Sequence, residues 1–344
     1  MTQVYRIILY APPYKESIER WVFCLLQIAP LARIRFNTCM KKLLEGTRQG
    51  GFVSKMGSAI ISPKFIISVG IVLVLSSFGV WQYHRMTNQD RVFWGMVSNN
   101  LQVSSYSRHT YQKSGAQSVD QVFETATSPQ NKVFSKTVFT QTGVDSATAV
   151  TENIGTPTAD YVRYTSVETA QKQDFSSVLG LWGKSEAESG ATQGQIYNQS
   201  VLGVAPIGNL SASDRRELIK IMKDTKAYEY RVVETKHSFP FYRPNHTMMV
   251  TVNPVGYITA LKKYAQFTGL NHLKDVNPDE YAQSAKLSFT VSIDGWTHQM
   301  TETSQSSGGK REVISGVNMR KTLPPAPKDA ISVDELQSKL QLIQ

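Results

Sequence analysis

The sequence predicts an α+β protein, in which a curved antiparallel sheet wraps over helices and a single transmembrane helix precedes the sheet. Three observations lead to this fold class. An uncharged, mostly apolar run extends from Phe65 to Trp81. Between Tyr106 and Glu168, short stretches rich in Thr, Val, Ser, Phe and Tyr alternate with turn residues, which is typical of antiparallel strands joined by hairpins. Segments with apolar residues at helical spacing stand before and after these strands.

Most of the positive charge lies at the N-terminus. The 344 residues carry a formal net charge of +10. Residues 1–64 hold ten Lys and Arg against three Glu, a net +7, which leaves 27 basic and 24 acidic residues, or +3, for the remainder. This distribution argues against a basic nucleic-acid-binding domain, so we expect no nucleic-acid partner. Cys24 and Cys39 are the two cysteines, so the chain after residue 64 can form no disulfide and no zinc–cysteine site.

The apolar run predicts a membrane anchor. As a helix, the nineteen residues Phe65–Tyr83 would span roughly 28 Å, close to the hydrocarbon thickness of a bilayer. The positive-inside rule places residues 1–64 in the cytoplasm and the C-terminal part outside. We therefore expect a single-pass protein of the cell membrane. A cleaved signal peptide and a buried core helix are alternatives, and Met56 is an alternative start of the chain.

The sequence divides into four regions. These are a basic cytoplasmic segment 1–64, a signal anchor 65–83, an extracytoplasmic α+β domain 84–323, and a Pro-rich linker with a short C-terminal helix 324–344. Within the domain, residues 170–210 are expected to be the loosest part, a long loop that either gates a pocket or is simply solvated.

Periodicity and capping residues predict the individual elements. Expected helices are Asn88–Leu101, Asp214–Asp224 with Ser213 or Asp214 as its cap, Asn253–Gly269, Asn277–Ala285, and one that begins at the capping box Ser332–Glu335. Expected strands are Ser105–Tyr111, Val119–Thr127, Lys132–Thr140, Ala147–Asn153, Tyr161–Thr169, Ala227–Thr235, Thr247–Val252, Leu287–Ile293, Trp296–Ser304 and Arg311–Arg320. Asp294-Gly295 predicts a tight hairpin turn.

Several local features stand in an order that is shared with a known group of proteins. Phe93-Trp94 opens the first helix, Val250–Pro254 forms a strand-to-helix step, Val291–Gly295 begins a hairpin, and a Pro-rich segment follows. Over roughly Asn88–Pro325 this order resembles the LolA/LppX-like group of bacterial envelope proteins. The resemblance implies a half-barrel whose concave face holds acyl chains. The predicted transmembrane anchor and the long 170–210 segment depart from the group.

The resemblance also implies candidate residues for a ligand-binding cavity. They are apolar and lie on the strands that would face the helices: Met248, Val250, Val252, Leu287, Phe289, Val291 and Ile293. Such a cavity would bind lipid tails through buried apolar area, at about 0.8 kcal/mol for each methylene. The alternative is that these side chains fill an ordinary core.

No catalytic or metal-binding signature stands out in the sequence. The six histidines do not form a His-Glu-x-x-His motif, and there is neither a Gly-x-Ser-x-Gly elbow nor a phosphate-binding P-loop. Glu186 and Glu188 lie in the predicted loop, where a fixed acid–base geometry is not expected. We therefore expect a protein that is not an enzyme and uses no cofactor and no metal.

These observations predict a membrane-anchored bacterial envelope protein that binds or senses lipids or lipoproteins in a hydrophobic cavity. Its expected partners are the membrane, a lipid or acyl-chain ligand, and a second protein of the envelope. The rival interpretation is a structural or regulatory protein-interaction domain of the envelope, with a filled core and no ligand.

Overall fold

The computed structural model describes residues 63–127, 131–185, 194–238, 243–270, 273, 275–305 and 309–343. The chain divides between Val80 and Trp81 into two compact units. The predicted cytoplasmic segment lies almost wholly outside the described residues, as does the alternative start at Met56. The same holds for Glu186 and Glu188.

The segment Phe65–Tyr83, for which the sequence predicts a membrane-spanning helix, lies within helix α3 (Pro63–Thr87). The side chains of residues 63–70 and 72 lie outside the described ones. Within the part of the chain that the structure does describe, no helix combines the length and the apolar character that crossing a membrane requires.

Twelve strands form one sheet in the second unit. The first six are β1 (Ser105–Ser114), β2 (Gln117–Ala126), β3 (Lys132–Gln141), β4 (Ala147–Gly155), β5 (Asp160–Thr169) and β6 (Trp182–Ser185). The others are β7 (Tyr228–Ser238), β8 (Arg243–Val252), β9 (Leu287–Asp294), β10 (Met300–Gln305), β11 (Gly309–Ser315) and β12 (Ala330–Ser332).

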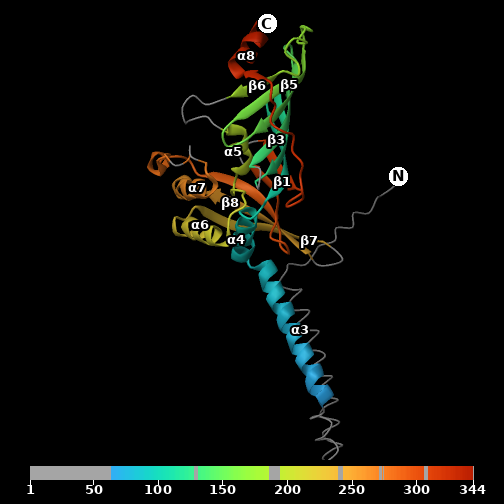
Figure 1. Ribbon diagram of the computed structural model, residues 1–344. Coiled ribbons are helices and arrows are strands. Elements are labelled where there is room, and N and C mark those ends of the chain that lie inside the picture. Colours follow the sequence, from blue (N-terminus) through green and yellow to red (C-terminus); the bar gives the residue numbers. More distant parts are fainter. Residues whose placement is uncertain are drawn as a thin grey trace, which may run out of the picture. The chain divides into compact units, whose positions relative to one another are not determined.

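The strand order is β12-β6-β5-β4-β3-β2-β1-β11-β10-β9-β8-β7. Two antiparallel meanders, β1 to β6 and β7 to β11, are joined by the pairing of β1 with β11, and only the short β12–β6 pair is parallel. The order starts at β12 and stops at β7, so the sheet formed by the described strands is open. Figure 1 shows that it is curved and that α5, α6 and α7 lie on one side of it. The predicted α+β class with a curved antiparallel sheet is confirmed.

The helices begin and end largely where the capping residues predict. They are α4 (Gln89–Asn100), α5 (Gln195–Val201), α6 (Ala212–Asp224), α7 (Pro254–Thr268) and α8 (Val333–Gln341), with the 3-10 helix η2 (Pro278–Tyr281). Gly269 ends α7 with a φ of 75°, a conformation that glycine adopts without strain. The Ser332 hydroxyl accepts from the Glu335 amide at the start of α8. The cap of α6 is Ser211, not Ser213 or Asp214.

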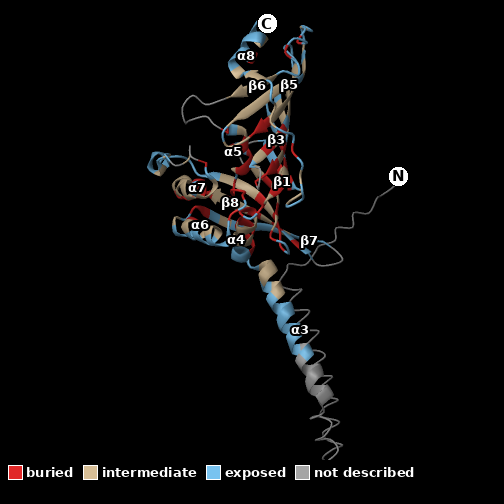
Figure 2. Ribbon diagram, in the orientation of Figure 1, coloured by how far each residue is buried: buried red, intermediate tan, exposed pale blue. Residues whose placement is uncertain are grey.

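Helix α4 carries the centre of the core. Val92, Phe93, Met96 and Val97 have no exposed surface, as the three- and four-residue spacing predicts. The ring of Phe93 stacks on Tyr230 with 4.0 Å between centroids. Buried residues gather between the helices and the central strands (Figure 2).

Several local predictions were wrong. Residues 170–210 are not one long loop, because they contain β6 and α5 and bury Phe175 and Val178 against Leu336 of α8. The Pro-rich linker is followed by a strand, β12, which pairs with β6. The helix predicted after Asn277 is only the one-turn η2, and β11 ends at Ser315 instead of Arg320.

The predicted tight turn at Asp294-Gly295 is a wider loop, since β10 begins only at Met300. The Asp294 carboxylate accepts hydrogen bonds from the amides of Trp296 and Thr297, at 3.1 and 2.7 Å. An aspartate that bonds to the backbone two and three residues onward stabilises such a loop in place of a two-residue turn.

Two histidines hold the end of α3 on the sheet. His246 Nε2 lies 2.6 Å from the Met86 carbonyl oxygen, and His298 Nε2 lies 3.2 Å from that of Arg85. These carbonyls stand in the last turn of α3, where helical partners are missing. Burial lowers the pKa of His298, so its ring is held neutral. Gly95 of α4 makes room for this ring, because a Cβ there would stand 2.2 Å from His298 Nδ1.

We expect Gly95→Ala to destabilise the protein by about 1–3 kcal/mol, because the added methyl group forces His298 out of place. Thermal unfolding of the full chain measures this effect. Gly79→Ala is the matched control, since a Cβ there meets nothing within 4 Å, and helix propensity predicts equal or slightly higher stability. Equal melting temperatures for Gly95→Ala and the unsubstituted protein would contradict the contact.

Candidate functional site

The larger of two described hollows, called the concave cavity here, lies between the sheet and the helices. Its volume is about 760 Å³, within the range of small-molecule sites. It is lined from β1, β2, β9, β10 and β11 on the sheet side, and from α5, α7 and the segment after α5 on the helix side. The lining residues are Arg108, Thr110, Gln112, Val119, Gln121, Phe123, Gln195, Asn198, Gln199, Leu202, Gly203, Val204, Tyr257, Leu261, Phe289, Thr303, Gln305, Lys310 and Glu312.

The helix-side wall includes the last turn of α5 and the irregular segment 202–207, which tyrosine hydroxyls fix in place. Tyr228 donates to the Val204 carbonyl at 2.8 Å, and Tyr264 donates to that of Ile207 at 2.7 Å. Tyr106 and Tyr257 donate to the carbonyls of Ser200 and Gly203. Burial raises the pKa of all four phenols, so each remains a neutral donor at physiological pH.

The sheet-side wall carries a buried charged group. Arg108 of β1 donates to the main-chain carbonyls of Gln199 and Leu202, and its guanidinium lies 4.7 Å from the centre of the Phe123 ring. Glu312 of β11 receives a hydrogen bond from Thr303 at 3.2 Å and pairs with Lys310 at 2.9 Å. The concave cavity is therefore amphipathic, with apolar and ionised side chains in the same wall.

Opposing influences act on the Glu312 carboxyl. Burial favours its neutral form, but the charges of Arg108 and Lys310 and the hydrogen bonds from Lys310 and Thr303 outweigh burial and lower its pKa. The carboxylate is thus ionised at neutral pH.

The seven cavity residues expected from the sequence do not come together in this cavity. Met248, Val250, Val252, Val291 and Ile293 are buried in the main core, with at most 5% of their surface exposed. Leu287 is 48% exposed. Phe289 alone among the seven lines the concave cavity. Five of the seven are therefore ordinary core residues, which was the alternative interpretation.

Sequence reasoning missed the polar residues of the cavity. In β1 the residues that face the helices are Tyr106, Arg108 and Thr110, which are buried, while His109 and Tyr111 on the other face are exposed. Polar residues at alternate positions ordinarily indicate a solvated face. Only tertiary structure shows that helices cover this face.

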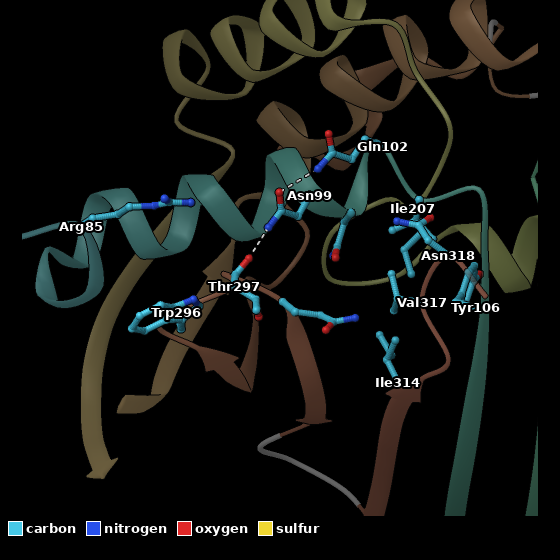
Figure 3. Close-up of a pocket in the computed structure, with 13 residues that line it drawn as sticks. Arg85, Asn99, Gln102, Tyr106, Ile207, Trp296, Thr297, Ile314, Val317 and Asn318 are labelled. Atoms are coloured by element: carbon cyan, nitrogen blue, oxygen red, sulfur yellow. Dashed lines mark hydrogen bonds between the residues drawn. The ribbon is translucent and has the colours of Figure 1, made fainter. Parts of the chain in front are cut away.

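A second, smaller hollow of about 490 Å³ lies at the C-terminal end of α4 (Figure 3). Asn99 donates to the Thr297 carbonyl at 2.6 Å and accepts from Gln102 at 3.0 Å. Asn318 accepts from the Ser104 amide at 2.8 Å. Because these hydrogen bonds occupy much of its polar lining, we place the candidate ligand site in the concave cavity. Among the described residues, no group of three His, Cys, Asp or Glu side chains could hold a metal ion.

Comparisons with known proteins give only distant likenesses. No protein-family model and no curated protein matches the chain. The crystal structure of LprF from Mycobacterium bovis is similar at 10% identity and a TM-score of 0.35, covering 68% of this chain and 95% of that one. A beta-barrel-like protein of a domain of unknown function from Brucella abortus has 8% identity and a TM-score of 0.20, covering 62% and 96%. Similarities this weak do not indicate a ligand or an activity for this chain.

We expect Tyr228→Phe and Tyr264→Phe each to destabilise the protein by about 1–3 kcal/mol, because each removes a buried donor and leaves a main-chain carbonyl without it. Thermal unfolding of the full chain measures the loss. Tyr111→Phe is the control, since that ring is 42% exposed and its replacement should change stability by less than about 0.5 kcal/mol. Losses no larger than that of the control would show that the hydroxyls do not hold the segment.

Proposed function

We propose that this chain is a non-enzymatic protein of the bacterial cell envelope that binds the acyl chain of a lipid or lipoprotein in the concave cavity. The observation that supports this function most directly is the cavity itself, about 760 Å³ between sheet and helices. Phe123, Leu202, Leu261 and Phe289 supply apolar surface from both sides. Each methylene buried there contributes about 0.8 kcal/mol to binding.

We further propose that α3 attaches this domain to the cell membrane, with residues 1–64 on the cytoplasmic side and the domain outside. The described part of α3 exposes large apolar side chains to an unusual degree. Leu73, Val74, Leu75 and Phe78 are 57–68% exposed, and such contiguous apolar surface is costly in water. The positive charge of residues 1–64 supports the orientation.

A bulky side chain placed in the concave cavity should abolish acyl-chain binding. Val119 of β2 lines the cavity, so we expect Val119→Trp to remove photolabelling of the cavity strands by a hexadecanol that carries a diazirine on its chain. Val122 of the same strand is 39% exposed and faces the other side of the sheet. Val122→Trp is therefore the matched control and should label normally.

Peptide mapping of the cross-links in membranes that contain the full chain gives the measurement. Absence of label from the cavity strands in the unsubstituted protein would contradict lipid binding and favour a protein-interaction domain. Equal labelling of Val119→Trp and Val122→Trp, mapped to these strands, would contradict the position of the site.

Charges on α3 should release the protein from membranes. We expect the double variant Leu75→Arg, Phe78→Arg to move from the membrane pellet to the soluble fraction after cell lysis, because two buried Arg cost several kcal/mol in a bilayer. Met319→Arg is the control, since Met319 is 66% exposed in the other unit. A double variant that stays in the pellet like the control would contradict attachment through α3.

A further inference from the structure

Four neighbouring polar side chains line the concave cavity although they are more than nine-tenths buried. Arg108 is 4% exposed, Thr110 7%, Thr303 3% and Glu312 9%. Strand pairing sets Thr303 opposite Glu312 and Glu312 opposite Thr110, so these three residues form one row across β10, β11 and β1. Arg108 lies two residues before Thr110 on the same face of β1. This row would not strengthen the binding of a purely hydrocarbon ligand, because burying polar groups costs free energy unless they are fully paired.

The charges in this wall do not balance. Arg108 and Lys310 are cations, and Glu312 is the one anion among the residues that line the cavity. Lys310 already pairs with the carboxylate at 2.9 Å, whereas the hydrogen bonds of Arg108 go to main-chain carbonyls. The cavity therefore holds a net charge of +1. A buried charge without full compensation attracts an ion of opposite sign.

Two polar atoms in the same wall of the cavity also lack hydrogen-bond partners. Within the described structure, Nε of Arg108 and Oγ1 of Thr110 are buried without a hydrogen-bond partner. Buried polar atoms are nearly always paired in folded proteins. Two unpaired atoms on one strand, one of them on a cation whose charge is only partly compensated, indicate a position where a ligand supplies the missing acceptor.

We propose that the concave cavity selects amphiphiles with a singly anionic head group. The head group binds at Arg108, Thr110 and Lys310, and the hydrocarbon chain lies against Phe123, Leu261 and Phe289. This inference rests on the proposed lipid-binding function and adds to it the chemical class of the ligand. A carboxylate or a phosphodiester meets the requirement equally, because each brings one charge and several acceptor oxygens.

A matched pair of probes separates head-group recognition from chain burial. Hexadecanoic acid and hexadecanol, each with the same diazirine on the chain, are titrated at pH 7.5 onto membranes that contain the full chain, and cross-links are mapped to the cavity strands. We expect the acid to reach half-maximal labelling at a concentration at least about tenfold lower than the alcohol. Acetate, which has the charge without the chain, should not compete.

Substitution of the cations tests the assignment of residues. Arg108→Gln should abolish the preference for the acid. Because that variant removes a buried group, Lys310→Gln provides a second test at a side chain that is 42% exposed. It should weaken labelling by the acid more than labelling by the alcohol, so that the ratio of their half-maximal concentrations falls about two- to fivefold. Lys220→Gln on the exposed side of α6 is the control and should match the unsubstituted protein.

The outcomes separate the two proposals. Equal half-maximal concentrations for acid and alcohol would overturn the anionic head group and leave lipid binding intact. No labelling of the cavity strands by either probe would overturn lipid binding and this inference together. Competition by acetate as effective as that by unlabelled hexadecanoic acid would show a site for small free anions and overturn the amphiphile. If Lys310→Gln weakened labelling by the alcohol and by the acid equally, the proposal that Lys310 binds the head group would be overturned.

Discussion

Four tyrosine hydroxyls that donate to the main-chain carbonyls of residues 200–207 are the constraint on which the rest of this domain depends. Ser200 stands in the last turn of α5, and residues 202–207 have no regular secondary structure, so these carbonyls lack helical or strand partners. The tyrosines reach this segment from β1, β7 and α7, elements far apart in sequence. One segment thus ties both meanders and a helix together, and buried phenols supply the hydrogen bonds that such a segment needs.

The same hydrogen bonds determine where the cavity lies. With its backbone fixed by the tyrosines, the segment after α5 holds Leu202, Gly203 and Val204 at a distance from the sheet, and they form the wall opposite β1 and β11. Arg108 reinforces this spacing, because its guanidinium bridges from the sheet to the carbonyls of Gln199 and Leu202. The wall is therefore held by directional bonds in addition to the apolar packing of Val204, Ala205 and Ile207 in the main core.

Local signals in the sequence were sufficient for much of the fold. Alternating patterns located the strands of both meanders, and Asn88, Pro254, Gly269 and Ser332 marked helix ends that the structure retains. The site was not predictable in this way. Burial of Arg108 depends on the crossing of segments far apart in sequence, and the placement of residues 200–207 depends on hydroxyls donated from elsewhere. A segment of this kind reads as a loop until such partners are known.

The row of polar residues also explains why the concavity is not filled by side chains. Strand pairing continues the row of Thr303, Glu312 and Thr110 through Gln121, Thr137 and Thr151. Below it, Tyr106 and Phe123 belong to the main apolar core. Helices with apolar faces gain no free energy by packing on a row of hydroxyl, amide and carboxylate groups. On β11, β1 and β2 the core therefore ends at this row, whereas on β9 and β8 the row continues into the core with Val291 and Met248. The space beyond the polar part of the row is open to a ligand that can satisfy polar groups at one end and bury hydrocarbon at the other.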